Sequence, residues 1–574
     1  MLLRHELAEA IAQAIRAAQA AGDLPAFDLP RGGNTIERPV QRKKGVATPT
    51  YGDYATPIAL SLARLAHIAP LQVAEQIVKH LPPHPAIGQV TIAPPGYINF
   101  TLDATWLARQ VETILAAGET WGNLDLGAGQ KVQVEHGSIN PTGPLHVAHG
   151  RNVVIGDTLA NVLAAAGYQV QREYYINDAG SQVRNFGASV YARYAQALGQ
   201  YVPFPEQGYQ GAYVVEMGHT IANEYGSKFL DMPREGGLAA VTQIALELVL
   251  ADIRDTLAQL RITYDNWFSE RSLYTSGRWD QVFSLLKEKG LVVERDGAVW
   301  FAAQELGEDK DAVLIRSPQV IADERDRPTY LASDIAYLWD KLVVRGFDKA
   351  IYVWGADHHG DVPRLKAAAR ALGLDPNRIV IILYQMVLLR RGDQIVRMSK
   401  RTGDIITLRE VIEEVGPDAV RFMLLTRAAD SQMDFDLELA MRQSAENPVY
   451  YVQYGHARIA SILRKAQSLG FSAENGDVTL LKDPAELALI RKMLELPELM
   501  EMAATHLEPH HLPHYAQALA TVFHDFYERC QVLPTERAPV PPARTAARLK
   551  LVRAAQIVLA RTLHLMGMTA PEAM

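Results

Sequence analysis

The sequence predicts a multidomain α/β protein: a Rossmann-like doubly wound parallel domain between a small α+β N-terminal domain and an all-α C-terminal helical bundle. The chain has 574 residues, more than one hydrophobic core normally supports. A β-loop-α-β pattern begins at residue 131, and after about residue 410 strand-like runs give way to helical ones. We therefore expect domains over residues 1–105, 106–410 and 411–574.

The first domain opens with an amphipathic helix. Apolar residues recur at near-helical spacing over residues 2–15, with charged residues between them. A signal peptide would need an uninterrupted apolar stretch, so this segment is not expected to be one. A turn at 52–57 precedes a second helical stretch over 58–81, and strands are expected within 89–102. No window approaches 18 consecutive apolar residues, so we expect no membrane span.

Composition narrows the class of protein. The net charge of −8 argues against an overall basic nucleic-acid binder, although it permits a local basic surface. Cys530 is the single cysteine, which excludes an internal disulfide and a cysteine-based zinc cluster. It also fits a reducing, cytoplasmic compartment.

The central domain begins with a strand at 131–136, a loop, a helix over 152–166 and a second strand at 168–178. Gly167 stands where a helix C-terminal glycine belongs. A helical insertion is expected over about 180–290, and strands return near 349–360 and 378–389. The loop after the first strand is where a doubly wound sheet binds its ligands.

That loop reads NPTGPLHVAHGR and contains His146 and His149. It lacks both the dinucleotide-binding and the P-loop glycine patterns. At a spacing of three on a starting helical turn, the two imidazoles share a face and can both donate to one phosphate. The alternative is that they cap the loop and the helix; a zinc pair would need further ligands.

A second motif, VRMSKRTGD, follows a late strand of the same domain and contains Lys400. Alone it is typical of a solvated basic turn. Together, the two motifs resemble the two-part signature of class I aminoacyl-tRNA synthetases. The resemblance implies that His146, His149 and Lys400 are catalytic. It places a further set of residues at ATP: Pro141, Ala148, Met398 and Ser399.

The chain resembles arginyl-tRNA synthetases almost from end to end. The resemblance is carried by the segments GDYAT (52–56), YYINDAGSQ (174–182), PTYLASDIAY (328–337), NPVYYVQYGHARI (447–459) and the terminal PEAM. It implies ATP-dependent ligation of L-arginine to the 3′ end of tRNA(Arg) through an arginyl-adenylate, with release of AMP and pyrophosphate. It also implies Mg²⁺ with ATP and a monomer, while the missing cysteines predict no zinc.

A guanidinium is fixed best by carboxylates in planar, bidentate geometry. The resemblance places five residues around the arginine substrate: Glu135, Asn140, Tyr330, Asp334 and His358. Without the resemblance, Asp334 could as well be a helix cap as a substrate ligand, and Tyr330 could as well pack in the core.

The resemblance also implies that tRNA is held by Tyr451, Tyr454, Arg458 and Met574 at the anticodon loop, and by Asn99 at its outer corner. From spacing alone, the two tyrosines and Arg458 would form an aromatic core stripe with a snorkelling arginine. Two positions depart from the family pattern: Ala148 replaces a glycine, where its β-carbon narrows the approach of adenine, and Arg397 replaces a lysine. Two alternatives stay open: another class I synthetase, or a tRNA-binding protein that has lost aminoacylation.

Overall fold

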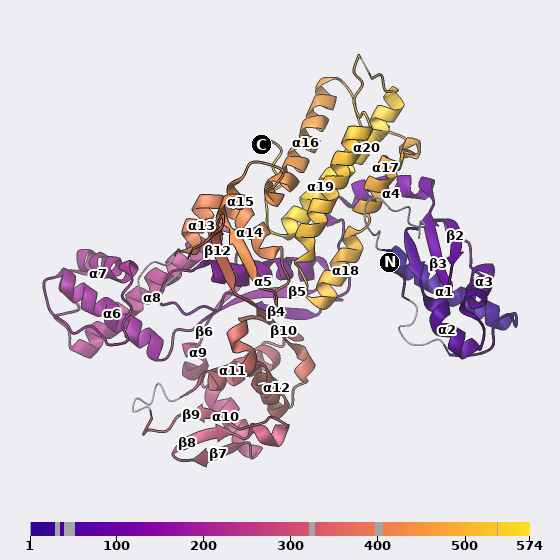
Figure 1. Cartoon of the computed structure of the whole chain (residues 1–574). Coiled ribbons are helices and arrows are strands. Elements are labelled where there is room, and N and C mark those ends of the chain that lie inside the picture. Colours follow the sequence, from indigo (N-terminus) through magenta and orange to yellow (C-terminus); the bar gives the residue numbers. More distant parts are fainter. Residues whose placement is uncertain (1, 29–34, 40–51, 321–327, 397–405, 537) are drawn as a thin grey trace.

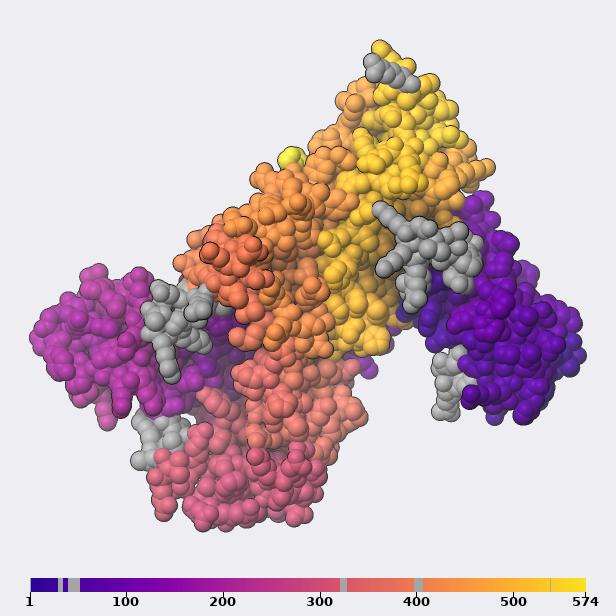
Figure 2. Space-filling view, viewed as in Figure 1, coloured from indigo at the N-terminus to yellow at the C-terminus, as the bar shows by residue number. Residues whose placement is uncertain are grey.

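The computed structural model describes residues 2–28, 35–39, 52–320, 328–396, 406–536 and 538–574. The molecule is extended (Figure 1). The N-terminal domain and the helices α6–α8 lie at opposite ends, and the C-terminal helices rise from the central sheet. The space-filling view shows the same arrangement, with the indigo N-terminal domain set apart on one side (Figure 2).

The N-terminal domain packs helices on one antiparallel sheet with the strand order β1-β3-β2. Its elements are α1 (Leu3–Ala20), β1 (Tyr54–Thr56), α2 (Ile58–Ala66), α3 (Pro70–Lys79), β2 (Ile87–Ala93) and β3 (Tyr97–Leu102). The single helical stretch expected over 58–81 is in fact two helices. His67 ends the first in a left-handed conformation, and Pro70 starts the second. Residues 54–56, expected as part of a turn, form β1.

The predicted fold class is confirmed by the central sheet. Within the described residues, five parallel strands run in the order β11-β10-β4-β5-β6. They are β4 (Lys131–Glu135), β5 (Gln169–Ile176), β6 (Asn266–Ser269), β10 (Lys349–Gly355) and β11 (Ile379–Tyr384). The helix α5 (Val147–Ala165) connects β4 to β5. The strand order reverses between β4 and β10, so the loops after these two strands flank the switch point where such sheets bind ligands.

Two excursions leave this sheet. The first contains α6 (Ser181–Ala197), α7 (Ala212–Tyr225) and α8 (Arg234–Gln259), after which β6 returns to the sheet. The second contains α9 (Arg271–Thr275), α10 (Arg278–Glu288), β7 (Val292–Arg295), β8 (Ala298–Phe301) and β9 (Ala312–Ile315). It leads to α11 (Tyr330–Trp339), a π-helical turn η4 (Asp340–Val344) and, after β10, α12 (Asp361–Leu372). Neither β6 nor the β7–β9 sheet was predicted.

Among the described residues, α8 is the one helix long and apolar enough, by length and composition, to cross a membrane. An 18-residue window in it has a mean hydropathy of 1.5, and 33% of that window is buried. The expectation that no segment spans a membrane stays a prediction. A core helix passes the same test, and α8 packs on α6 and α7, with Arg409 pairing to Asp252 and Asp255 on it.

The C-terminal region is helical apart from one strand. Its helices are α13 (Leu408–Val415), α14 (Pro417–Leu425), α15 (Leu437–Met441), α16 (Pro448–Ser468), α17 (Pro484–Met493), α18 (Leu496–His506), α19 (His511–Arg529) and α20 (Pro542–Leu565). Contrary to expectation, a strand follows residue 410: β14 (Met433–Asp436) pairs with β12 (Val387–Arg391), which also pairs with β13 (Gln394–Ile395). The helix α4 (Ala104–Ala117) packs on α17 and α20.

Ion pairs join the three parts of the chain. Arg38 and Asp53 of the N-terminal domain bind Glu498 and Arg491 of the helical bundle. The fully buried Arg421 of α14 pairs with Asp157 of α5 and donates to the carbonyl of Leu260 at 2.8 Å. The bundle is therefore attached to the helix that follows β4.

The C-terminal tail lies along α16. The Nδ1 atom of His456 is 2.8 Å from the carbonyl oxygen of Pro571, and the Gln453 amide donates to the carbonyl of Thr569 at 3.2 Å. Arg464 donates to the carbonyl of Glu572 at 3.0 Å. Side chains of α16 thus hold the last residues, and Asp418 of α14 also binds Thr569.

Candidate active site

The two histidines stand at the start of α5. His146 is the N-cap residue, and its backbone N–H donates to Nδ1 of His149 at 3.2 Å. The two rings are stacked, with centroids 3.4 Å apart. Both histidines therefore take part in capping the helix. Their role at a phosphate stays a prediction, which the helix N-terminus favours because it attracts anions.

Two buried polar residues in the same helix hold its start in place. Asn152 accepts from the N–H of Gly137 at 2.6 Å and donates to the carbonyl of Val353 at 2.7 Å, so it joins the loop after β4 to β10. Arg151 is fully buried and donates to the carbonyls of Gln385, Ala428 and Ser431, each at 2.8 Å. Burial lowers the pKa of Arg151 to about 10. Both residues were missed by the sequence reasoning, although they follow the histidine motif directly.

Arg397, Met398, Ser399 and Lys400 lie outside the described residues. The chain on the C-terminal side of this segment is nevertheless fixed beside the histidines. Thr407 forms an isolated antiparallel bridge with His146, and the N–H of Leu408 donates to the carbonyl of Leu145 at 2.7 Å. The second motif therefore leads directly into a segment bonded to the first.

The helical insertion contacts the histidine loop through one tyrosine. The hydroxyl of Tyr213, on α7, donates to the carbonyl of Thr142 at 2.7 Å. Its ring lies against Gly143, where a β-carbon would approach the hydroxyl to 3.0 Å. The glycine thus allows the tyrosine close to the loop, and the insertion helps to set the loop's position.

Three carboxylates gather near the switch point, one from each of three elements. Glu135 ends β4, Glu270 follows β6, and Asp334 lies within α11. Burial, followed by the nearby Glu135 and Glu270, raises the pKa of Asp334 to about 8. Burial raises the pKa of Glu270 to about 7, against a hydrogen bond of 2.6 Å from Ser333. Burial and mutual repulsion therefore disfavour the charged form of both acids.

Glu135 already has a cation. The fully buried Lys341, on the π-helical turn, donates to its Oε2 atom, and Ser138 donates to its Oε1 atom at 2.8 Å. The ammonium of Lys341 also lies 3.9 Å and 3.7 Å from the ring centroids of Tyr337 and Tyr352. The charge of Glu135 is therefore balanced inside the protein by Lys341.

The structure decides between the alternatives given above for Asp334 and Tyr330 and places the other predicted residues. Asp334 lies inside α11 and is not its cap, and Tyr330, the first residue of that helix, is 57% exposed and not a core residue. Asn140 donates to Gln182 at 2.6 Å. His358 follows β10 beside Asp361, which raises the pKa of the imidazole. Pro141 and Ala148 are buried in the loop and the first turn of α5.

A second surface lies on the helical bundle. Arg458 donates to the hydroxyl of Tyr454 at 2.9 Å, and its guanidinium carbon is 4.8 Å from the centroid of that ring. Tyr527 of α19, which the sequence reasoning missed, lies 5.3 Å from the same guanidinium. Tyr451 is partly buried and donates to Thr521 at 3.2 Å. Tyr454 and Tyr527 are 37% and 40% exposed, so this group is a cationic aromatic surface and not a core stripe.

The two remaining predicted residues differ in exposure. Met574 is 57% exposed at the end of the tail. Asn99, in β3, is 3% exposed, whereas Tyr97, two residues earlier on the same strand, is 39% exposed.

Comparisons with known families match the chain in three consecutive parts. Residues 5–102 match the family model described as Arginyl tRNA synthetase N terminal domain. Residues 110–461 match tRNA synthetases class I (R), catalytic domain, and residues 452–574 match the DALR anticodon binding domain.

Whole proteins give the same result. The chain is 47% identical over 574 residues to the arginine–tRNA ligase of Dehalococcoides mccartyi, covering 100% of this chain and 99% of that protein. It is 46% identical over 579 residues to that of Heliobacterium modesticaldum, with the same coverage. The Thermus thermophilus arginyl-tRNA synthetase structure aligns over 100% of both chains with a TM-score of 0.74 at 24% identity. That of Plasmodium falciparum covers 100% of this chain and 99% of its own, with a TM-score of 0.72 at 17% identity. At these identities the two structures support the fold alone.

Proposed function

The chain belongs to the arginyl-tRNA synthetase family, and from that membership we propose how its individual residues act. The protein is a class I aminoacyl-tRNA synthetase that ligates L-arginine to tRNA(Arg) with ATP, through an arginyl-adenylate and with release of AMP and pyrophosphate. This removes another class I specificity from the alternatives.

In the first step, the carboxylate of arginine attacks the α-phosphate of ATP. His146 and His149 donate to that phosphate while charge develops on it, beside the N-terminus of α5. Lys400, with Met398 and Ser399, meets the leaving pyrophosphate, and Pro141 and Ala148 line the adenosine side. Mg²⁺ enters on the ATP phosphates, which is how this ion commonly binds. The side chains position and stabilise, and none forms a covalent bond.

Asp334 and Glu270 receive the guanidinium of the substrate. The single observation that carries this assignment is the pair of raised carboxyl pKa values beside a third carboxylate whose charge Lys341 already balances. Glu135, paired with Lys341, lies beside these two acids and does not bind the guanidinium directly. Tyr330, Asn140 and His358 border the arginine site. A substrate without a guanidinium leaves the two acids without a partner, which gives strong discrimination.

The tRNA lies across the bundle in this proposal. Tyr451, Tyr454 and Arg458 offer stacking faces and a cation to unpaired anticodon bases, and Met574 lies at the edge of the same helix. Asn99 is proposed at the outer corner of tRNA, where its burial makes it a support for the exposed Tyr97.

We further propose a monomer that acts in the cytoplasm without a membrane partner. The sole cysteine, Cys530, is buried and free, as suits a reducing compartment. The carboxylates of α8 that bind Arg409 support its packing inside the protein and not in lipid.

Arginine-dependent exchange of pyrophosphate into ATP tests the whole assignment. With tRNA(Arg) present, exchange is expected with arginine and not with lysine, ornithine or citrulline, since these lack the charged guanidinium. Omission of tRNA measures whether activation requires it. A folded protein that binds tRNA but exchanges with no amino acid would support the alternative of a binding protein that has lost aminoacylation.

The contact between the insertion and the histidine loop gives a first mutational prediction. Tyr213→Phe removes the donor to Thr142 and keeps the ring, so kcat for exchange is expected to fall by about 3–10-fold, in line with one hydrogen bond. Tyr201→Phe, at an 89% exposed position before the same helix, is the matched control and should leave kcat unchanged. Equal kcat values for the two variants would show that the contact does not position the loop.

The pH dependence follows from the two raised carboxyl pKa values. Protonated Asp334 and Glu270 cannot pair with a guanidinium, so kcat/KM for arginine should rise between pH 6 and pH 8.5, through about 7 and about 8. The free energy of unfolding of the ligand-free protein should change with pH in the opposite direction. Both values exceed the unfolded values of about 4, so the free protein loses stability as pH rises through this range.

Exchange rates and thermal unfolding across that range measure both effects. Glu270→Gln should remove the lower of the two steps in kcat/KM for arginine. A pH-independent kcat/KM would contradict the roles given to both acids.

A further inference from the structure

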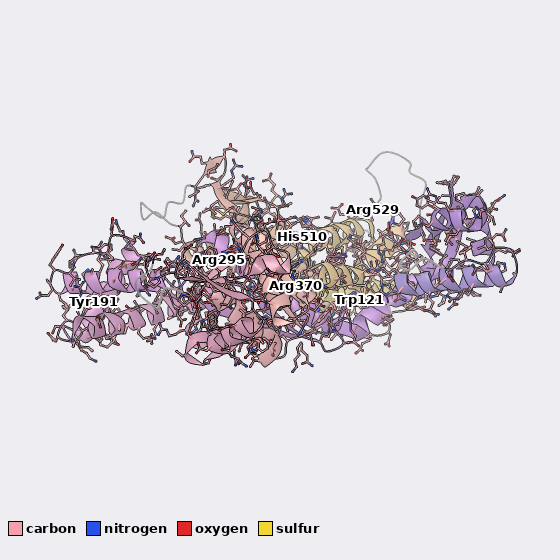
Figure 3. The ribbon with its side chains drawn as sticks, turned by 90° about the horizontal axis from the view of Figure 1, so that it is seen from below. Trp121, Tyr191, Arg295, Arg370, His510 and Arg529 are labelled. Carbon is pink, nitrogen blue, oxygen red and sulfur yellow. The ribbon has the colours of Figure 1, made fainter. Side chains whose placement is uncertain are left out.

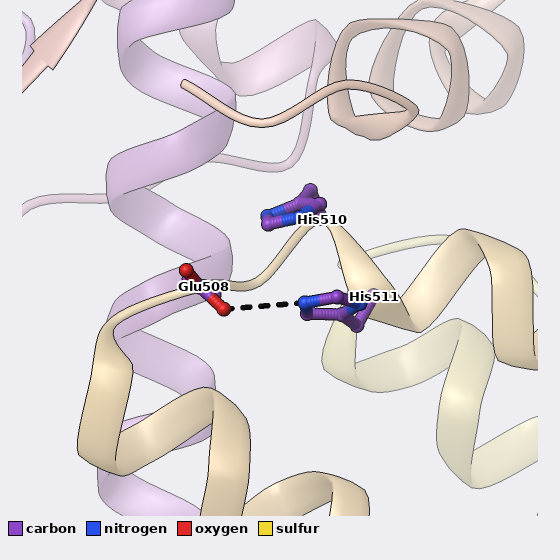
Figure 4. Close-up of side chains that lie close together, drawn as sticks. All are labelled: Glu508, His510 and His511. Atoms are coloured by element: carbon purple, nitrogen blue, oxygen red, sulfur yellow. Dashed lines mark hydrogen bonds and ion pairs between the residues drawn. The ribbon is translucent and has the colours of Figure 1, made fainter. Parts of the chain in front are cut away.

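The turn between α18 and α19 brings together three side chains that can ligate a metal ion: Glu508, His510 and His511 (Figure 4). Each offers one ligand atom, and these atoms all lie within 4.8 Å of one another. The Nε2 atom of His511 is 3.2 Å from Oε2 of Glu508. The two rings are 4.1 Å apart between centroids, and in the close-up their nitrogens face the same side as the carboxylate.

The surroundings favour a cation at this turn. Glu508 and Asp430 both act on His510 as negative charges. His514, one turn further along α19, is already hydrogen-bonded to the carbonyl of Thr426 at 3.0 Å.

We propose that Glu508, His510 and His511 form a binding site for one divalent transition-metal ion of the Zn²⁺ class. Two imidazole nitrogens and one carboxylate oxygen are a donor set that suits such ions, with water completing the coordination, whereas Mg²⁺ and Ca²⁺ prefer oxygen throughout. The sequence reasoning predicted no metal because cysteines are missing, and that reasoning does not extend to a site built from histidine and glutamate.

The position of the site suggests what the ion does. His510 lies where the bundle meets the central domain (Figure 3). His511 and His514 line a hollow of about 710 Å³ between α18, α19 and the start of the N-terminal domain. An ion held here would fix the α18–α19 turn close to the segment that contains Thr426 and Asp430. It acts on stability and domain attachment and takes no part in arginine activation.

Direct metal binding tests the proposal on the full-length protein after treatment with a chelator. Equilibrium dialysis against Zn²⁺ alone should give one bound equivalent that is lost in the His510→Ala, His511→Ala double variant. Each single variant and Glu508→Gln should weaken binding by about tenfold or more. Zn²⁺ should raise the unfolding temperature of the wild type and not that of the double variant.

Control variants separate this site from other donors. His219→Ala removes an exposed histidine on α7 and should keep the bound equivalent. His149→Ala should also keep it, which excludes the active-site pair, and the buried Cys530 offers no accessible thiol. Unfolding of each variant without metal shows that it is folded. No bound equivalent in the wild type, or an equivalent that survives in the double variant, would overturn the proposal.

Discussion

Asp334→Asn is expected to lower kcat/KM for arginine by about 10²–10³-fold, which corresponds to losing one partner of a buried charge pair. Asparagine keeps the shape of the side chain but cannot supply the negative charge that the guanidinium needs. The loss should appear in KM for arginine as well as in kcat, while KM for ATP changes little. Steady-state exchange kinetics over an arginine series, with saturating ATP and tRNA, measure it.

Asp296→Asn is the matched control. It removes one negative charge from the turn between β7 and β8, where the residue is left-handed and exposed and where asparagine is well tolerated. Its kinetics should equal those of the wild type. If Asp334→Asn behaved like this control, the guanidinium would have to be held elsewhere, and Glu270 would be the first residue to replace.

Lys341→Met is expected to destabilise the free protein by about 3–5 kcal/mol, because it leaves Glu135 as a buried charge without its cation. Methionine preserves the length and the packing against Tyr337 and Tyr352, so the loss reports the charge and not a cavity. Denaturant unfolding without ligands measures the change in the free energy of unfolding.

The double variant Lys341→Met, Glu135→Gln isolates the pair. With both charges removed, much of the stability should return, because neither group is then a buried ion. Lys310→Met, at an exposed position, controls for the loss of a lysine. Additive losses in the double variant would contradict the internal neutralisation of Glu135 by Lys341.

The sequence predicted the parts of the site that are local in the chain. His146 and His149 share one turn, and Glu135 ends a strand with a clear apolar pattern, so neighbouring residues suffice to place them. Asp334 came from the family resemblance. Its location inside a helix, and the exposure of Tyr330 at the start of that helix, required the structure.

The residues that sequence reasoning missed depend on distant partners. Glu270 follows the four-residue strand β6, too short to show a period of two within a stretch dominated by helices. Lys341 is buried because Glu135, more than 200 positions earlier, pairs with it. From the sequence alone, Arg151 would be expected at the surface. The structure shows that it is buried because three backbone carbonyls accept its hydrogen bonds. The pattern of apolar and polar residues predicts whether a residue is buried, but not which distant residues it contacts.

The attachment of the C-terminal tail to α16 has a practical consequence for work on this protein. Because His456 and Gln453 fix the last residues beside Tyr454 and Arg458, an affinity tag fused after Met574 would emerge on the face proposed for the anticodon loop. The amino terminus lies in the separate N-terminal domain, away from that face (Figure 1). Purification handles, fluorophores and surface-immobilisation anchors therefore belong at the start of the chain.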